Sequence, residues 1–546
     1  MASGIEIPGR AGLAWLSVRS LHADRALAHR IGIGLLLLVG FWLRCRGVLW
    51  DVVALDLDEA SWARRLLTKP LTELLIRPPG YMALTKLVVE LFGPWEFALR
   101  SLSWFSGLLV LFTAPGLART LLASPAARLL FVAVIALHPA AIDLSKEFKP
   151  YAASLAVHWG LLYFVATYRQ TRSRRALLGA LALLPLGVLF AQDAVFAYPG
   201  VVLVLAAVAY QARDRRHLAQ IGASVAATFA TLGALYFLIW NRLEVGSGGS
   251  ETQFWGVKYG VFYSPGRVEG QTFWDWLFER WTGMMAFPGH RRRIWNDTGW
   301  EAPAEVLRTI DFWLWVGLFV AGVLVLLYRR NAKKALLLIL PLLVMTAANL
   351  VGVWPLGAFR TNVFLLVYTA LVAAVAVDQL GRRLRSAGAA FVPALGLVVA
   401  PFVAFETTWH ANKRVFSESS ALPQAMHEVL TLQGGKSRSR ELLILDSRGC
   451  SAFKFYTRYH PGFKRSLPRD FSRRLRPSCT EISPSRLRRV VQEESGENRR
   501  VWMILGWSRS FEKYADEVPS GVRLVHRVPI TMGGSLTNLV LGLEAE

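Results

Sequence analysis

Four acidic residues lie close together near the start of a chain whose formal net charge is +24. Asp51, Asp56, Asp58 and Glu59 directly follow the apolar stretch 31–49. A carboxylate can take the proton of a hydroxyl group that attacks an electrophile, and such general-base catalysis contributes about 10²- to 10⁴-fold to a rate. This segment is therefore the first candidate for chemistry.

Basic residues follow these carboxylates along the chain. They are Arg64, Arg65, Lys69, Arg77 and Lys149. Displacement of a phosphate from a sugar carbon needs both kinds of group: a carboxylate takes the proton of the attacking hydroxyl, and cations stabilise the charge that develops on the phosphate. The alternative is structural, because Asp58 precedes "EASWARRLL" and aspartate is a favoured N-cap of a helix. Both interpretations can hold for different residues.

The hydropathy of the chain predicts a membrane protein. Hydrophobic residues make up 53% of it and charged residues 18%, and apolar runs recur near the length needed to cross about 30 Å of hydrocarbon. The sequence predicts a polytopic α-helical membrane protein with about eleven transmembrane helices. The expected spans are 31–49, 97–118, 128–142, 152–168, 176–190, 194–210, 218–240, 306–328, 334–353, 362–380 and 388–409.

Lys and Arg are concentrated in alternate connections between these spans. The connections are "ARTLLASPAAR", "YRQTRSRR", "ARDRRH", "YRRNAKK" and "GRRLRS", and the N-terminal segment 1–30 is basic too. Cytoplasmic loops carry such an excess. The alternation holds if 78–93, which contains Lys86 and Glu90, is a helix in the membrane interface rather than a span. The N-terminus is then cytoplasmic, the carboxylates lie outside, and the protein spans the inner or plasma membrane.

Three external loops interrupt the membrane domain, which covers 31–409. They are 50–96, 143–151 and 241–303. The third is rich in tryptophan, which is typical of side chains seated at the headgroup level of a membrane. Within it, "QTFWDWLFERWTGMM" (271–285) has the pattern of an amphipathic helix on the membrane surface.

Residues 410–546 are predicted to form an extracytoplasmic α/β domain. The strand-like runs "ELLILDS", "RVWMILGW", "VRLVHRVPI" and "LTNLVLGL" alternate there with helix-like stretches such as "SPSRLRRVVQEE". Cys450 and Cys479 both lie in this domain, and an oxidising compartment would allow them to pair. Cys45 lies in the first span.

Motifs for several other chemistries do not occur in the sequence. It contains no GxxxxGK[ST], no GxGxxG behind a strand, no CxxC pair and no HExxH. "DLD" at 56–58 has the form of a motif that holds a metal ion and a nucleotide sugar, but no nucleotide sugar is expected outside the cytoplasm. His138 and His158 are expected to be satisfied interior residues rather than metal ligands. No cofactor is required by the sequence, and a divalent metal ion has no support from it.

The order of the motifs resembles the GT-C superfamily of integral-membrane glycosyltransferases, in the branch of protein O-mannosyltransferases and lipid A aminoarabinose transferases. These proteins have an acidic pair after the first span, and Asp58-Glu59 is similar to it. "RPPGYMALTKLVVELFG" and "PWEFALRSLSWFSGLL" resemble the next interfacial helix and second span. "HPAAIDLSKEFKPYAASLAVHW" resembles the second external loop, and "WPLGAFRTNVFLLVY" a later loop with an arginine. The resemblance covers 30–200 and, less fully, 340–380.

The resemblance implies a role for each matching residue. Asp58 would be the general base, and Glu59 would orient the acceptor or raise the pKa of Asp58 through its like charge. The implied phosphate ligands are Arg77, Lys149 and Arg360, while Glu147 would contact the acceptor or support the site, with Tyr151 as a hydrogen-bond partner. "EFKPY" departs from relatives that place an aspartate there, which leaves the residue that supports the acceptor open.

The resemblance also implies the reaction. Family members use a polyprenyl-phosphate sugar, so we expect inverting transfer of a hexose or pentose to an extracytoplasmic hydroxyl group of a protein, lipid or polysaccharide. Two other functions stay open: a transporter or flippase of lipid-linked glycans, and a membrane-anchored scaffold that binds a glycan. Transporters usually bury ionisable residues near mid-membrane and contain repeats, whereas these carboxylates lie at the rim of a span and no repeat is evident. No nucleic-acid partner is expected, since the Lys and Arg residues are concentrated in alternate connections, as in the cytoplasmic loops of membrane proteins.

Overall fold

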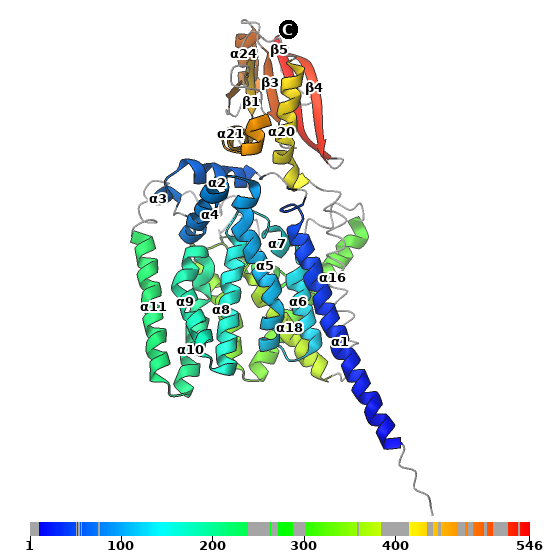
Figure 1. The fold of residues 1–546 in the computed structure, drawn as a ribbon, viewed down its shortest axis with the longest axis vertical. Helices are drawn as coiled ribbons and strands as arrows, with labels where there is room; N and C mark the ends of the chain where they lie inside the picture. The colour runs from blue at the N-terminus through cyan, green and yellow to red at the C-terminus, as the bar shows by residue number, and fades with distance from the viewer. Residues whose placement is uncertain are drawn as a thin grey trace, which may run out of the picture.

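Among the residues that the computed structural model describes, ten helices form a bundle, and Figure 1 labels most of them. They are α1 (Arg10–Cys45), α5 (Glu96–Leu121), α6 (Pro125–Leu137), α8 (Tyr151–Thr171), α9 (Arg174–Phe190), α10 (Tyr198–Gln211), α11 (Arg215–Leu235), α16 (Glu301–Tyr328), α17 (Ala332–Leu350) and α18 (Leu365–Arg383). The structure describes residues 10–50, 52, 55, 57–74, 77–237, 262–263, 271–287, 301–357, 360–383, 414–433, 441–445, 449–466, 475–478, 484–495, 500–505, 522–532 and 535–545.

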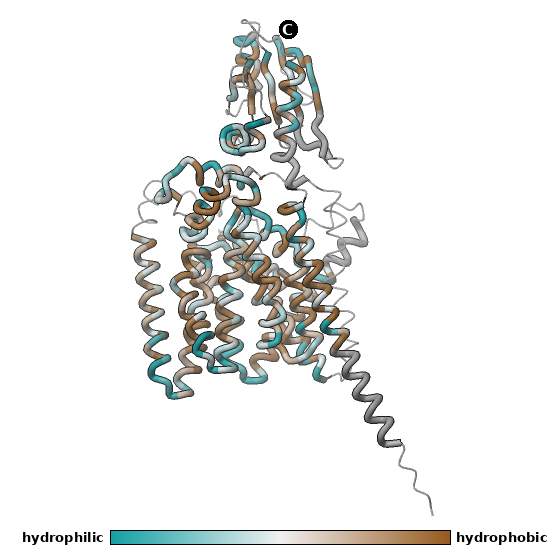
Figure 2. The backbone as a smooth tube through the Cα atoms, viewed as in Figure 1, coloured by the Kyte–Doolittle hydropathy of each residue, from teal (hydrophilic) through white to brown (hydrophobic). Residues whose placement is uncertain are grey.

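The bundle confirms the predicted class of helical membrane protein. Six helices among the described residues are long and apolar enough to cross a membrane, and Figure 2 shows apolar residues along the middle of the bundle. Each of the first ten expected spans overlaps a different helix of the bundle, and span 128–142 also includes most of the short helix α7 (Pro139–Asp143). The eleventh, 388–409, lies outside the described residues, so the total of about eleven stays a prediction.

Helices α16 and α18 pack so closely that the contact depends on a glycine. A Cβ atom added to Gly322 would lie 2.0 Å from the carbonyl oxygen of Val372. Any other residue would therefore push the two helices apart. The contact places α18 at the centre of the bundle, where the run from Val363 to Ala374 is buried.

Proline shapes the junction that leads to the second predicted external loop. Pro139 lacks an N–H group and begins the short helix α7 (Pro139–Asp143), so the carbonyl of Ile135 loses a donor within its own helix. The buried guanidinium of Arg44 donates to this carbonyl at 2.8 Å and to that of Ala136 at 3.0 Å. The end of α1 is thereby fixed to the end of α6.

Three short helices lie across one end of the bundle (Figure 1). They are α2 (Leu57–Thr68), α3 (Leu71–Leu74) and α4 (Pro79–Phe92). Helix α4 confirms the helix predicted over 78–93. It buries Tyr81, Met82 and Val89 and exposes Leu84, Leu87, Leu91 and Phe92. An exposed apolar face of this kind suits a helix in the membrane interface.

The helix predicted over 271–285 is also present, as α14 (Phe273–Met285). It begins with a capping box, in which Thr272 and Asp275 satisfy each other's backbone N–H groups. Trp276 and Met284 are buried, whereas Trp274 and Phe278 are exposed. The helix packs against α16, as expected for a surface helix with one apolar face toward the bundle.

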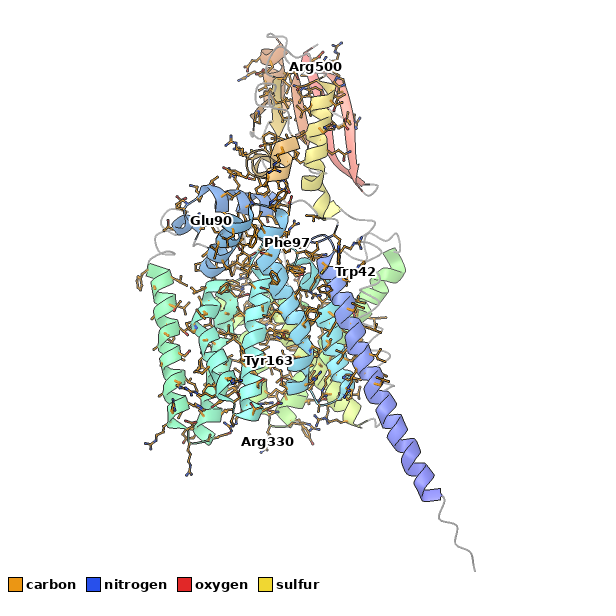
Figure 3. The ribbon with its side chains drawn as sticks, in the orientation of Figure 1. Trp42, Glu90, Phe97, Tyr163, Arg330 and Arg500 are labelled. Atoms are coloured by element: carbon orange, nitrogen blue, oxygen red, sulfur yellow. The ribbon has the colours of Figure 1, made fainter. Side chains whose placement is uncertain are left out.

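The end of the bundle opposite α2–α4 carries the basic connections. Lys333 and Lys334 lie close enough to Arg169 for their charges to interact, and Lys333 also donates a hydrogen bond to Gln211. Figure 3 shows Arg330 at this end, far from Glu90 on α4. The alternate connections predicted to share one side of the membrane therefore do meet at one end of the bundle.

A sheet domain lies beyond α2 and confirms the predicted α/β domain (Figure 1). Its strand order is β2-β1-β3-β5-β4, with β1 parallel to β2 and β3, and β5 antiparallel to β3 and β4. The strands are β1 (Glu441–Leu445), β2 (Leu475–Ser478), β3 (Val501–Leu505), β4 (Val522–Met532) and β5 (Ser535–Ala545). Strand β2, "LRPS", was not predicted because it is short and has no alternating apolar pattern.

Both faces of this sheet are covered. Leu442 and Ile444 pack with α24 (Pro484–Ser495) on one face. Leu443 and Leu445 point to the other, where the helices are α20 (Arg414–Leu432), α21 (Gly449–Arg458) and α22 (Pro461–Ser466). Alternation along β1 divides its side chains between the two cores.

The cysteines divide between the bundle and the sheet domain. Cys45 is buried and free, whereas Cys450 is disulfide-bonded. Cys479 lies outside the described residues. The pairing of Cys450 with Cys479 therefore stays a prediction.

Candidate active site

The two adjacent acids of the first external loop point in different directions. Asp58 and Glu59 occupy the first turn of α2, and neighbouring residues of a helix project about 100° apart. The side chain of Asp58 is 58% exposed, whereas that of Glu59 is fully buried. Only Asp58 is thus available at the surface of the site.

Asp58 faces two cations from distant parts of the chain. The Nη2 atom of Arg360 lies 2.9 Å from Asp58 Oδ2, and the Nζ atom of Lys149 lies 3.8 Å from the same oxygen. Partial burial raises the pKa of Asp58, but the positive charges of Lys149, Arg360 and Arg77 outweigh it, and the pKa lies below its ordinary value. The carboxylate is therefore ionised at neutral pH.

Lys149 is held by the segment that connects α7 and α8. Its side chain is 3% exposed, and its backbone carbonyl accepts a hydrogen bond of 2.7 Å from Ser103 on α5. The hydroxyl of Ser103 also contacts that of Tyr81 on α4, at 2.9 Å. Gly107 lets the segment approach α5, because a Cβ atom there would lie 2.4 Å from Ser145. The position of the lysine is fixed by three elements.

Trp62 organises two of the cations and was missed by the sequence analysis. The guanidinium carbon of Arg77 lies 3.2 Å from the centroid of the indole ring, and Lys149 Nζ lies 4.1 Å from it. Both are cation–π contacts. Trp62 is four residues after Asp58 and so lies on the same face of α2. The four-residue spacing between Asp58 and Trp62 was the only feature of the sequence that could have identified Trp62 as part of the site.

Glu59 anchors α2 to the bundle. Its oxygens accept hydrogen bonds of 2.9 and 2.6 Å from the guanidinium of Arg100 on α5, and one of 2.5 Å from the Phe148 amide. The positive charge of Arg100 neutralises Glu59 where it is buried. The pKa of Asp58 lies below its ordinary value, and an opposing effect of the like charge of Glu59 stays a prediction. Arg100 was also missed by the sequence analysis.

Arg360 opens the short helix η4 (Arg360–Asn362). Partial burial lowers its pKa, but Tyr151, Asp58 and Glu147 raise it above its ordinary value, so the guanidinium stays charged. Its central carbon lies 5.8 Å from the centroid of the Tyr151 ring. Glu147 and Tyr151 therefore lie close enough to the arginine for their charges to interact with it, and Tyr151 is also close enough to Asp58 for such an interaction.

Asn362 fixes the loop that carries Arg360. Its side-chain amide donates to the carbonyls of Pro355 and Gly357, both at 2.9 Å, and accepts from the indole N–H of Trp354 at 2.7 Å. Asn362 is fully buried. A loop cross-linked in this way holds the arginine in a defined place.

The structure thus brings six of the seven predicted site residues together at one end of the bundle. Asp58 is in direct contact with Lys149 and with Arg360, Arg77 and Lys149 both lie over the ring of Trp62, and Glu147 and Tyr151 lie near Arg360. The seventh, Glu59, is directed into the core. Asp51 and Asp56 lie outside the described residues. Within the described ranges, no group of three His, Cys, Asp or Glu is arranged to hold a metal ion.

Both interior histidines make hydrogen bonds, but His158 is satisfied only in part, because its buried Nε2 has no hydrogen-bond partner among the described residues and lies 3.9 Å from Asp193 Oδ1. His138 Nδ1 accepts from the Ala140 amide, and its Nε2 contacts the Phe287 carbonyl at 3.1 Å. His158 Nδ1 contacts the Tyr368 hydroxyl at 2.9 Å. Each imidazole thus has a partner among the residues that pack around it.

Part of the chain matches a known protein family. Residues 76–240 match the family model described as dolichyl-phosphate-mannose-protein mannosyltransferase. The resemblance predicted from the sequence is therefore confirmed over this segment, which includes Arg77, Lys149 and Tyr151. Asp58 and Arg360 lie outside it. No curated protein matches the chain.

Two crystal structures of ArnT from Cupriavidus metallidurans are similar to this chain. The one bound to undecaprenyl phosphate has a TM-score of 0.49 and 12% sequence identity, with 94% of this chain and 97% of that chain covered. The apo structure has a TM-score of 0.47 and 13% identity, with 95% and 98% covered.

Proposed function

We propose that the chain is a membrane glycosyltransferase that transfers a sugar from a polyprenyl-phosphate donor to a hydroxyl group of an acceptor outside the cytoplasm. The observation that carries the proposal is the contact of Asp58 with Lys149 and Arg360, which places a carboxylate beside two cations. The match of residues 76–240 supports the donor class, because the family description names a sugar linked to a polyprenyl phosphate.

Each group has a part in the displacement. Asp58 accepts the proton of the acceptor hydroxyl as its oxygen forms a bond to the anomeric carbon. The bond between that carbon and the phosphate oxygen breaks, and the polyprenyl phosphate leaves with the electron pair. Lys149 and Arg360 stabilise the negative charge on the departing phosphate. Attack from the face opposite the leaving group inverts the anomeric carbon.

Donor binding would also activate the base. Lys149 and Arg360 contact Asp58, and the donor phosphate would compete with the carboxylate for the same cations. A carboxylate with weaker cation contacts has a higher pKa and is a stronger base. Asp58 would therefore become effective when the donor is in place.

The position of the basic connections supports the orientation of the protein. They meet at the end of the bundle opposite α2 and the sheet domain (Figure 3). Lys and Arg are enriched on the cytoplasmic side of membrane proteins. In the proposed orientation, the candidate active site and the sheet domain lie outside the cytoplasm.

Mass spectrometry of lipid-linked sugars tests this proposal. Cells without the protein should accumulate the polyprenyl-phosphate sugar, and wild-type protein should restore its turnover. Asp58→Asn should fail to do so, whereas Arg65→Gln, a change at an exposed position of the same helix, should succeed. If Asp58→Asn restores turnover as well as wild type does, the proposed chemistry is wrong. If the lipid-linked pool is the same with and without the protein, the donor class is wrong.

A further inference from the structure

The sheet domain contacts the segment that leads into α2. The hydroxyl of Tyr456, on α21, accepts a hydrogen bond of 2.7 Å from the Leu55 amide and donates one of 3.1 Å to Glu96 Oε1 at the start of α5. Tyr456 and Leu55 are both buried. A single hydroxyl thus links the domain to the chain three residues before Asp58.

His460 holds the other oxygen of the same glutamate. Its Nδ1 atom accepts the Phe463 amide at 3.1 Å, so the ring hydrogen of the neutral imidazole is on Nε2. That nitrogen lies 2.8 Å from Glu96 Oε2 and donates to it. The ring of Trp95 packs edge-on against His460, with centroids 5.1 Å apart. Both carboxylate oxygens of Glu96 are therefore bound by the sheet domain.

An apolar core continues across this contact. One buried cluster includes Ala60 and Ala63 of α2, Leu99 of α5, and Phe455 and Trp502 of the sheet domain. Domains joined by a flexible linker usually meet through smaller and more polar surfaces. A shared core makes α2 and the sheet domain move as one unit.

Helix α2 is consequently held from two sides. Glu59 binds Arg100 and the Phe148 amide on the bundle side, and the Leu55 amide binds Tyr456 on the other. Asp58 lies between these two attachments. We infer that the sheet domain is a positioning element of the candidate active site, and that the Tyr456 hydroxyl fixes the direction in which Asp58 faces. This inference deepens the proposed function and rests on it for the role of Asp58.

The inference is tested by removing one hydroxyl. In Tyr456→Phe, kcat should fall about tenfold, because a buried amide loses its partner and a small displacement of a catalytic group is costly. The KM for the donor should change less than about twofold, since the proposed phosphate ligands, Lys149 and Arg360, are on the bundle rather than on α2 or the sheet domain. Tyr459→Phe is the matched control, because Tyr459 is a partly buried tyrosine just beyond α21.

Hydrogen–deuterium exchange provides a readout that needs no turnover. In Tyr456→Phe, amides of 55–68 should exchange faster than in wild type, whereas those of β1 and β3 should not change. If the proposed function is wrong, wild-type protein will transfer no sugar, but the exchange experiment still decides whether the sheet domain positions α2. Equal exchange and equal kcat in Tyr456→Phe and Tyr459→Phe would overturn the inference.

If Tyr456→Phe unfolds the sheet domain, a second pair of variants, at His460, still tests the inference. His460→Gln keeps an N–H group where Nε2 lies and should retain at least half of the wild-type kcat. His460→Ala removes the donor to Glu96 and should show the lower kcat and faster exchange of 55–68. If the two His460 variants behave alike, the contact with Glu96 does not position α2.

Discussion

The buried ion pair between Glu59 and Arg100 allows the role of Glu59 to be measured. The two side chains are 0% and 1% exposed and share hydrogen bonds of 2.9 and 2.6 Å. Removing one member leaves the other as an uncompensated buried charge, which costs about 3–5 kcal/mol of stability. Glu59→Gln and Arg100→Met should each lower the free energy of unfolding by about that amount.

The double variant separates an anchor from a group that contacts the acceptor. Glu59→Gln/Arg100→Met contains no unpaired charge, and the glutamine oxygen can still accept from the Phe148 amide. Replacing both members of a buried pair is often nearly neutral, so its stability should lie within about 1–2 kcal/mol of wild type. If Glu59 acts only as the anchor of α2, sugar transfer should recover together with stability.

Stability is measured by denaturant titration of the protein in detergent, and transfer is measured on the same preparations. The coupling energy of the double-mutant cycle gives the strength of the pair. A double variant that is stable but inactive would restore the role first predicted for Glu59, as an acceptor contact. Single variants as stable as wild type, or a double variant with the summed loss of both, would refute the anchor.

Three further predictions test other parts of the site and the topology. Arg360→Ala should move the acid limb of the kcat/KM profile to higher pH, because the arginine lowers the pKa of Asp58 against the opposing effect of burial; an unmoved limb would contradict this. Trp62→Leu should weaken donor binding by about 2- to 30-fold through loss of cation–π contacts of about 0.5–2 kcal/mol, whereas Trp62→Phe should lose less. Equal donor affinity in both variants would show that the ring does not organise the cations. Reporter fusions after Asp214 should score cytoplasmic and those after Glu546 external; a cytoplasmic C-terminus would reverse the orientation of the site.

Much of the fold was predictable because its signals are local. Apolar runs, basic connections and the four strand-like runs of the C-terminal segment each lie within short segments of sequence. Asp58 could also be identified from a local signal, because it lies after the first span and directly before a clear helical pattern. Strand β2 had no such local signal, because its pairing with β1 rather than its own composition makes it a strand.

The contacts that complete the site were not predictable without the fold. The hydroxyl of Tyr456 reaches the Leu55 amide across 401 residues of sequence, and Arg100 reaches Glu59 across 41. The acidic pair shows a second limit. Adjacent residues in sequence suggested a shared task, but the helix directs Asp58 toward the cations and Glu59 into the core.

The central claim is that Asp58 is the base and that the cations bind the donor phosphate. Its most direct test is to measure turnover and donor affinity separately in purified Asp58→Asn, with a short-chain polyprenyl-phosphate sugar as donor. Turnover should fall by about 10²-fold or more, because asparagine cannot take the proton of the acceptor. Donor affinity should remain at the wild-type level or increase, since the cations no longer face a competing carboxylate. Near-normal turnover in Asp58→Asn would contradict the account.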